Sequence, residues 1–448
     1  MTNNINSKLT LPAAALLIGA FFPTPAVARH PELDKQVAAD EPRLIDIFKK
    51  LHANPELSMQ ETETAALVAR EFKANGYEVQ TGINKTGVVG IMKNGPGPVI
   101  MFRADMDALP LKEETDLPYA STKSGETLDG LKSSIMHACG HDAHVTWLIG
   151  VAKVMAEQKA NWSGTLILVG QPAEEAYMGA AGMVKDGLYP KVPEPSVVFA
   201  SHTNPVWPAG AVGLGTGRRM AGADQLTVTI KGIGGHGSTP HASIDPIVMS
   251  AQAIMAYQTI VSRRIDQTEP VVVTVGAIQS GTVGNIIPDS ATMRLSIRWY
   301  SRSARDQIIA MVKQMTNAIA VGNGVPADRM PVYEGTQSIT PVINDDGLVA
   351  EMRPVLQETL GKENVYPGVP MQMGSEDFQM LGDPVKGVKI LHMEVGVAKP
   401  EVLKAFMTNG TMPAYMNHHP KFQVELPAIA AGVKANAAVL LELLKKRP

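Results

Sequence analysis

Residues 136–144 read Met-His-Ala-Cys-Gly-His-Asp-Ala-His and lead into a regular pattern of helix and strand. After them, residues 144–158 carry apolar side chains at helical spacing. Residues 165–169 then form a short apolar run, typical of a buried parallel strand. Two similar runs lie at residues 99–102 and 196–200. Strands that alternate with helices predict an α/β fold built on a mainly parallel sheet.

The opening stretch also contains Cys139, the only cysteine in the 448 residues. His137, Cys139 and His141 alternate, so an extended backbone would point them to the same side. A thiolate and an imidazole two residues apart can bind one zinc-like ion, because both are good ligands for such metals. The alternative is that Cys139 is a small packed hydrophobe, as lone buried cysteines often are.

Polar residues follow the ends of the three apolar runs. Asp105 comes after the first run, Glu174 and Glu175 after the second, and His202 after the third. Ligands of open α/β sheets bind beyond the carboxyl ends of the strands, so we expect these side chains and Cys139 to share one site. Neighbouring residues point in different directions. One of the two glutamates can therefore bind metal while the other faces the substrate.

Residues 1–28 resemble an export signal. Residues 9–22 are apolar, and Ala26-Val27-Ala28 forms a small-x-small cleavage site. The apolar run is too short to span a bilayer comfortably, so we expect no stable membrane anchor. We therefore expect a periplasmic or secreted protein cut after Ala28. The alternative is a hydrophobic N-terminus on a cytoplasmic protein. Export favours a metal role for the single cysteine, since an idle thiol is a liability outside the cytoplasm.

The rest of the chain is too long for one typical core, so two domains are expected. We expect residues 29–216 and 330–448 to form the catalytic domain, and residues 217–329 to form an inserted smaller domain. The insert shows the order strand, helix, strand, strand, helix, which predicts an α+β sandwich. These elements are expected at residues 226–230, 246–262, 271–278, 291–299 and 304–321.

Charge and composition exclude several classes of partner. The chain has 40 Lys and Arg residues against 43 Asp and Glu residues, a formal net charge of −3. This balance provides no basic footprint for nucleic acid or for an anionic membrane surface. The sequence shows no internal repeat and no P-loop. A small-molecule substrate is therefore expected rather than a nucleic acid.

Short motifs follow one another along almost the whole chain after residue 28. They are HANPELS with a later Glu at 52–61, RADMDALP at 103–110, MHACGHDAH at 136–144, QPAEE at 171–175, SHTNP at 201–205, GGHGSTPH at 234–241, GNIIPD at 284–289, GSEDF at 374–378 and HHPKF at 418–422. The series resembles the dinuclear-metal amidohydrolases and exopeptidases related to aminoacylase and carboxypeptidase G. Within them it is most similar to the branch of hippurate hydrolase and the plant indoleacetyl-amino-acid hydrolases.

The resemblance implies a zinc-peptidase-like catalytic domain that binds two divalent ions, zinc or manganese. It implies a lid or a dimerisation role for the insert, and both monomers and homo-oligomers fit it. The five implied metal ligands are Cys139, His141, Glu175, His202 and His418. Cys139 would bridge the two ions, where related peptidases use an aspartate. The His-x-Pro spacing of the family selects His418 rather than the residue after it.

Three further residues receive catalytic roles from the resemblance. Glu174 resembles the general base, while His236 and Asn285 resemble the groups that hold the scissile carbonyl oxygen and the substrate carboxylate. Two divalent ions lower the pKa of a shared water and polarise the carbonyl. A carboxylate that is not a ligand must then take the proton of that water and pass it to the leaving amine.

The implied reaction is hydrolysis of an N-acyl amino acid to a carboxylic acid and a free amino acid. One alternative keeps the site but takes a dipeptide or short peptide, as a dipeptidase or carboxypeptidase does. A second alternative is a periplasmic binding protein that has lost catalysis. Binding alone would not need Glu174, so the intact Glu174-Glu175 pair favours an enzyme. The sequence names neither the acyl group nor the amino acid.

Several supporting residues can also be assigned. Asp105 or Asp142 is expected to orient a ligand imidazole. Asp105 and Asp107 follow a buried strand and are expected to support the site, with solvated loop residues as the alternative. His144 is expected to cap or pack at the start of its helix.

Three patterns lie away from the expected ligands. Ser58 and Glu61 fit a capping box for a following helix. Arg298 is expected on the charged face of an edge strand, with binding of a substrate carboxylate as the alternative. The Met-rich stretch Ala398–Asn417 is expected to be a loop that shapes an apolar acyl pocket, because thioethers adapt to irregular apolar surfaces.

Overall fold

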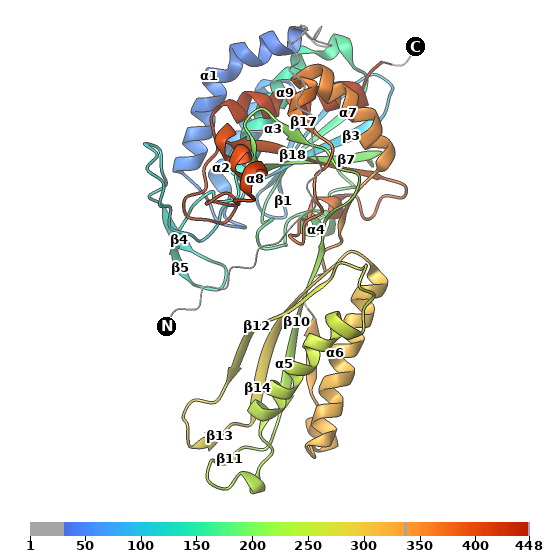
Figure 1. Cartoon of the computed structure of the whole chain (residues 1–448). Coiled ribbons are helices and arrows are strands. Elements are labelled where there is room, and N and C mark those ends of the chain that lie inside the picture. Colours follow the sequence, from blue (N-terminus) through green and yellow to red (C-terminus); the bar gives the residue numbers. More distant parts are fainter. Residues whose placement is uncertain (1–30, 336–337, 447–448) are drawn as a thin grey trace.

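The computed structural model describes residues 31–335 and 338–446. These residues form a large lobe and a smaller elongated lobe joined by extended segments (Figure 1). The expected export signal at residues 1–28 lies outside the described part of the chain. Within that part, no helix combines the length and the apolar character needed to cross a membrane.

The large lobe is organised around an eight-stranded sheet with the order β1-β2-β6-β3-β7-β18-β8-β17. Its central neighbours β6, β3, β7 and β18 run parallel, while the hairpin of β1 and β2 adds antiparallel strands at one edge. This sheet confirms the predicted α/β fold. The strands are β1 (Glu78–Ile83), β2 (Gly87–Asn94), β3 (Val99–Asp105), β6 (Gly164–Gln171), β7 (Val197–Pro208), β8 (Val212–Gly213), β17 (Val365–Tyr366) and β18 (Lys389–Ala398).

Helices cover both faces of this sheet. Helices α1, α3, α7 and α9 pack around one another and enclose the main apolar core, while α4 lies with a smaller core on the other face. Helix α2 packs against the hairpin of β1 and β2. The helices are α1 (Pro31–Ala53), α2 (Thr62–Ala74), α3 (His141–Glu157), α4 (Ala180–Lys185), α7 (Asp346–Leu360) and α9 (Pro427–Leu443).

Helix α3 begins three residues earlier than the sequence pattern predicts, at His141 rather than His144. Gly140 has φ +84°, a left-handed conformation that glycine adopts without steric cost and that turns the chain directly into the helix. The prediction of an extended backbone through His141 is therefore wrong. His141 and His144 lie three residues apart at the start of the helix, so their side chains are neighbours on one face of it.

The small lobe contains a four-stranded antiparallel sheet with the order β12-β14-β10-β15. Helices α5 and α6 pack on it and enclose a separate apolar core. The strand β15 pairs with β10, so this sheet extends past residue 329, the boundary expected from the sequence, as far as Gly335. The elements are β10 (Gly222–Lys231), α5 (Pro246–Arg263), β12 (Val272–Ser280), β14 (Ser290–Trp299), α6 (Arg302–Gly322) and β15 (Val332–Gly335).

Short elements complete the chain. Residues 400–409 form the helix α8 (Pro400–Asn409), so the Met-rich stretch is not the simple loop expected from the sequence. The remaining strands form three two-stranded sheets: β4 (Ser124–Glu126) with β5 (Lys132–Ser134), β9 (Gly217–Met220) with β16 (Val342–Asn344), and β11 (Gly235–His236) with β13 (Ile286–Ile287).

Candidate active site

The candidate site lies at the carboxyl end of the parallel strands. Asp105 is the last residue of β3, and Glu174 and Glu175 follow β6, the neighbour of β3. His202 lies within β7 rather than after it, because β7 continues to Pro208. The loop that carries Cys139 enters α3 beside these strand ends. The sheet therefore gathers the polar residues that the sequence placed together.

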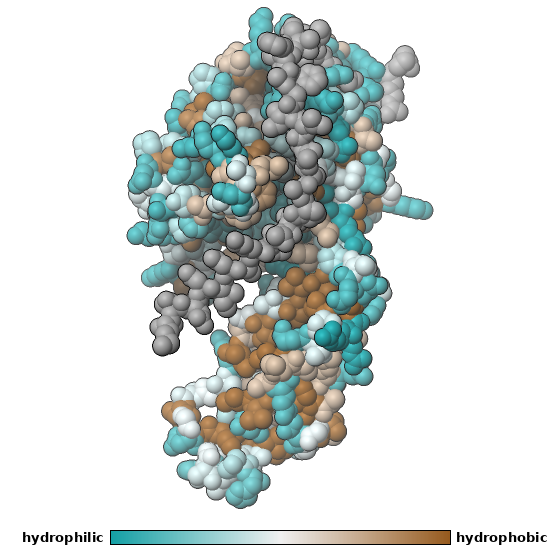
Figure 2. Space-filling model, viewed as in Figure 1, coloured by the Kyte–Doolittle hydropathy of each residue, from teal (hydrophilic) through white to brown (hydrophobic). Residues whose placement is uncertain are grey.

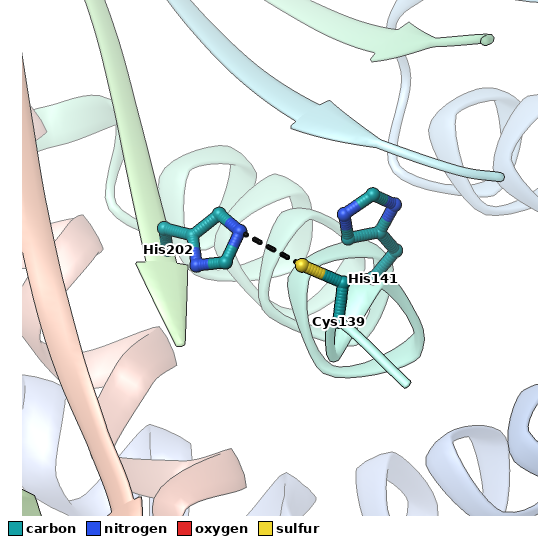
Figure 3. Close-up of side chains that lie close together, drawn as sticks. All are labelled: Cys139, His141 and His202. Atoms are coloured by element: carbon teal, nitrogen blue, oxygen red, sulfur yellow. Dashed lines mark hydrogen bonds between the residues drawn. The ribbon is translucent and has the colours of Figure 1, made fainter. Parts of the chain in front are cut away.

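All five predicted ligands lie in two overlapping groups. Cys139, His141 and His202 each place one donor atom within 4.8 Å of the others, and Cys139, Glu175 and His418 do the same. The Sγ atom of Cys139 lies 3.4 Å from Nε2 of His202, whose ring turns toward it in Figure 3. Nε2 of His418 lies 3.3 Å from Oε1 of Glu175. Cys139 belongs to both groups, as a ligand that bridges two ions must.

Three of the buried donor atoms in the two groups lack a hydrogen-bond partner among the described residues. Both ring nitrogens of His141 and Oε1 of Glu175 are buried and make no hydrogen bond within the described part of the chain. Buried polar groups without partners are costly, so such atoms call for an ion or another ligand. Thiolate, imidazole and carboxylate are the ligands that zinc-like ions prefer. The donor set therefore fits two divalent metal ions.

Hydrogen bonds to backbone carbonyls orient the ring of His202 and hold the segment that carries His418. Nδ1 of His202 donates to the carbonyl of Thr203 at 2.8 Å, which leaves Nε2 free to face Cys139. The backbone N–H of His418 donates to the carbonyl of Ala138 at 2.8 Å. This bond holds the C-terminal segment against the cysteine loop. His418 has φ +68°, so its backbone is held in an uncommon conformation at the site.

Burial and neighbouring charges shift the pKa values of Glu174 and Cys139 in opposite directions. Burial, followed by the nearby carboxylates of Glu376 and Glu175, holds the pKa of Glu174 well above its usual range. Burial also opposes ionisation of Cys139, but the charge of His202 and the hydrogen bonds from His141, His202 and His418 together outweigh it and hold the pKa of the thiol well below its usual range. Bound cations lower the pKa of nearby acids, so they would act on Glu174 in the opposite direction to its burial.

The turn that carries the two glutamates is held by Asp107. Its carboxylate accepts hydrogen bonds from the backbone N–H of Glu174 at 3.1 Å and of Glu175 at 3.0 Å. Ser58 donates its hydroxyl to the same carboxylate at 2.6 Å. Oδ1 of Asp107 also lies 3.4 Å from Nδ1 of His141. Asp107 thus links the predicted base, a predicted ligand and the loop before α2.

Glu61 holds the same turn through Ala173, the residue before Glu174. It accepts from the backbone N–H of Ala173 at 2.8 Å and from the hydroxyl of Thr86 at 2.6 Å. Ala173 has φ +50°, so the chain is constrained immediately before the glutamates. The predicted capping box of Ser58 and Glu61 is wrong, because Glu61 makes no side-chain cap to α2. Both side chains instead support the site, which the local sequence pattern could not show.

A buried arginine balances the acids behind the site. Arg103 donates to Asp105 at 2.6 Å, to Glu376 at 2.9 Å and to Asp377 at 3.1 Å. Its Nε also donates to Gln171 at 2.8 Å. Three buried carboxylates without a cation would be strongly unfavourable. The RADMDALP and GSEDF motifs therefore meet through Arg103, a role that the sequence analysis missed.

Of the two aspartates expected to orient a ligand imidazole, only Asp105 lies near one. Asp105 accepts from Nδ1 of His144 at 2.6 Å and lies 3.6 Å from Nε2 of His141. Nε2 of His144 in turn accepts from the backbone N–H of Thr203, so both of its nitrogens are engaged and it packs rather than ligates. Asp142 instead bonds His52 at 2.7 Å, so its expected role beside a ligand is wrong.

His236 and Asn285 do not meet the metal-ligand cluster in this chain. They lie beside each other at β11 and β13, and Gly237 bonds the carbonyl of Asn285. Both are exposed, at the end of the small lobe that points away from the large lobe (Figure 1). The sequence motifs predicted that His236 and Asn285 act together, but they did not predict their position at the far end of the small lobe.

A cavity of about 580 Å³ opens beside the cluster. Its lining includes Cys139, Glu174 and His202 from the large lobe and Arg298 from the small lobe. Arg298 lies on β14, which is flanked by β12 and β10, so the expected edge-strand position is wrong. Its guanidinium donates to Ser375 at 2.5 Å and lies 3.3 Å from the hydroxyl of Tyr177.

Comparison with known proteins identifies the family. The sequence model of peptidase family M20/M25/M40 matches residues 101–442. A relative named N-acetylcysteine deacetylase from Bacillus subtilis is 33% identical over 408 residues, covering 90% of this chain and 98% of that protein. The hippurate hydrolase of Campylobacter jejuni is 39% identical over 346 residues, covering 75% of this chain and 86% of that protein. The chain belongs to peptidase family M20/M25/M40.

A solved structure agrees with this assignment. It is a dinuclear metal-binding peptidase of the M20 family from Bacillus subtilis, 28% identical, with a TM-score of 0.71 over 91% of this chain and 99% of that chain. The family resemblance and the fold class predicted from the sequence are confirmed. The assignment as a hydrolase is confirmed with them.

Proposed function

We propose that this protein is a metal-dependent amidohydrolase that cleaves N-acyl amino acids to a carboxylic acid and a free amino acid. The observation that carries the proposal is the donor cluster around Cys139, with the carboxylate of Glu174 within 4.8 Å of donor atoms of His141 and Glu175 and on the wall of the same cavity. The relatives named for deacetylation and hippurate hydrolysis support this choice of substrate class. Two divalent ions, zinc or manganese, would be held by Cys139, His141, Glu175, His202 and His418.

Each residue then has a distinct task. When bound, the two ions supply Lewis-acid activation of water and of the scissile carbonyl. Glu174 takes the proton from the attacking water and delivers it to the nitrogen of the leaving amine. Asp107 keeps Glu174 and Glu175 in separate positions by holding both of their backbone N–H groups. Arg298 binds the carboxylate of the amino-acid half, because it lines the cavity and its guanidinium contacts Tyr177 and Ser375, which line the same cavity.

A substrate panel tests this proposal. The purified protein is assayed for release of free amino acid from N-acetyl, N-benzoyl and long-chain N-acyl amino acids and from dipeptides, before and after chelation and reloading with zinc or manganese. We expect release from N-acyl amino acids that depends on metal. Release from dipeptides alone would assign the protein as a peptidase. No release with two ions bound would contradict the proposal and favour a binding protein.

We also propose that a second copy of the chain brings His236 and Asn285 to the site. Their exposed position at the end of the small lobe supports this, because the distance from the cluster must be closed by another molecule or by a large movement. The edge strand β12 and exposed apolar residues of the lobe support pairing between copies, and apolar surface is visible there in Figure 2. Those residues include Ile247, Val248, Met255, Ile278, Val283 and Ile286.

Mixing inactive variants tests this pairing. His236→Ala and Glu174→Gln are each expected to be inactive, and a mixture that exchanges subunits is expected to regain activity through sites built from one intact half of each copy. Light scattering after size exclusion measures the mass in parallel. A monomer with full activity would contradict the pairing.

We propose, finally, that the protein is exported and cut after Ala28. The apolar run and the small-x-small site in residues 1–28 support export. Mass spectrometry of protein from fractionated cells tests this, with Arg29 expected as the first residue. Intact residues 1–28 on a cytoplasmic protein would contradict it.

A further inference from the structure

The cavity beside the cluster has an apolar wall that the reaction itself does not need. Next to Cys139 and His202 it continues along the end of β7 to α8 and the segment after it. Pro205 and Val206 contribute to this wall from β7, and Phe406 contributes from α8. Helix α8 packs against β7, which places it beside the strand that carries His202.

One side of this wall is rigid. The indole of Trp207 stacks on the ring of Tyr366, with ring centroids 4.5 Å apart and an interplanar angle of 15°. Its Nε1 donates to Glu394 at 3.2 Å, and Gln372 donates to the other oxygen of that carboxylate at 2.7 Å. Asn204 also donates to Glu394. The carboxylate of Glu394 is therefore satisfied by three donors, and Trp207 is held in a fixed orientation.

The other side of the wall is adaptable. Helix α8 lies wholly within the described residues and has no buried residue, although it carries several apolar side chains. Phe406, Met412 and Met416 line the cavity, and Met412 is 54% exposed. Methionine side chains are flexible and fill irregular apolar space. Side chains that remain exposed beside a cavity of about 580 Å³ can close on an apolar group that enters it.

We propose that this apolar wall holds the acyl group, and that α8 with the segment to Met416 selects medium- to long-chain or aryl acyl groups over acetyl. Among the described residues that line the cavity, Arg298 is the only Lys or Arg, and it reaches the cavity from the small lobe. The amino-acid carboxylate therefore pairs with Arg298, and the acyl half extends toward α8. The inference rests on the proposed function, because it names the acyl class for the same site.

A chain-length series tests the inference with the intact, metal-loaded protein. One amino acid is offered as its N-acetyl, N-butanoyl, N-hexanoyl, N-octanoyl and N-benzoyl derivatives, and kcat/KM is measured for each. Burial of a methylene contributes about 0.8 kcal/mol, which corresponds to about fourfold. Hexanoyl exceeds acetyl by four methylenes, so the expected ratio of kcat/KM is on the order of 100-fold, with roughly 200-fold as the upper limit.

Two variants on α8 provide a matched comparison. Phe406→Ala removes a lining side chain and is expected to lower the hexanoyl-to-acetyl ratio about tenfold or more. Met407→Ala changes a neighbouring residue that is 70% exposed and does not line the cavity, so its ratio is expected to match the original protein. Met412→Ser and Met416→Ser are expected to lower the ratio as Phe406→Ala does.

The outcomes separate the two levels of the proposal. Metal-dependent cleavage of all derivatives with a flat chain-length profile would overturn the acyl-wall inference and leave the proposed function standing. A steep profile that all of the wall variants preserve would also overturn it, because the selectivity would then lie elsewhere. Failure to cleave any derivative with metal bound would overturn the proposed function and the inference together.

Discussion

Asp107 is expected to control both the position of the base and the affinity for metal. The carboxylate of Asp107 accepts hydrogen bonds from the backbone N–H groups of Glu174 and Glu175. In Asp107→Asn, the side-chain amide keeps one acceptor oxygen, but its N–H₂ group faces the other backbone N–H group. A hydrogen bond to a charged group contributes about 1.5–3 kcal/mol. Loss of one such bond with a new donor–donor contact costs roughly 2–3 kcal/mol. We therefore expect kcat/KM to fall roughly 30- to 150-fold.

The assay compares a graded series of variants. Ser58→Ala removes only one donor to the same carboxylate and is expected to lower kcat/KM less than about tenfold. Asp116→Asn changes an exposed aspartate and is expected to leave kcat/KM unchanged. Metal affinity, measured by competition with a chelating dye, is expected to fall about 10- to 100-fold for Asp107→Asn. A folded Asp107→Asn protein with original kcat/KM and metal affinity would refute the reasoning.

Three further predictions concern stability and metal. Arg103→Met leaves three buried carboxylates without their cation and should lower the free energy of unfolding by roughly 3–5 kcal/mol in urea titrations; an unchanged midpoint would contradict this. Burial opposes the charge of His52, but hydrogen bonds to Asp142 and Glu113 raise its pKa to about 9. The contribution of protonated His52 to the free energy of unfolding is therefore full below about pH 6.5. It is lost as the pH rises to about 9, which lowers the free energy of unfolding by up to about 3 kcal/mol. His52→Gln should flatten this part of the dependence of stability on pH. Chelation should lower the Tm and abolish hydrolysis, and zinc or manganese should restore both; a Tm that does not respond to metal would contradict the proposed site.

The gathering of Cys139, Glu175 and His202 at one edge could be predicted because their chemistry and their positions in the chain agree, whereas the ligand set with His418 followed from the family resemblance. Glu175 and His202 follow or lie in strands of one parallel sheet, and the carboxyl ends of such strands share an edge. Cys139 and His141 enter the same edge through the start of α3. Residue type then limits the choice, since thiolate, imidazole and carboxylate at one edge have few other uses.

Asp105 and Asp107 could be predicted to support the site, but the other supporting residues could not, because local patterns compete with tertiary contacts. Ser58 and Glu61 match a capping box, yet their side chains reach Asp107 and Ala173 instead. Asp142 stands beside a predicted ligand in sequence, but α3 turns it toward His52. Spacing along the chain does not determine which side of a helix faces the metal until the first residue of the helix is known.

The small lobe shows a different limit. Its strands and helices follow the sequence pattern closely, but the pattern does not show that β14 is internal or that β15 joins the sheet after residue 329. Arg298 was therefore expected at an edge. Sheet order depends on pairing between distant strands, for which one sequence carries little information.

The central claim is that Glu174 performs proton transfer without being needed to hold the metal. The most direct test measures metal content and amino acid release in the same preparations of the original protein, Glu174→Gln and Glu175→Gln. We expect Glu174→Gln to keep about two metal ions per chain and to lose at least 10²-fold in kcat, the range typical of general base catalysis. Glu175→Gln should lose metal as well as activity. Full activity in Glu174→Gln, or loss of its metal, would contradict the account.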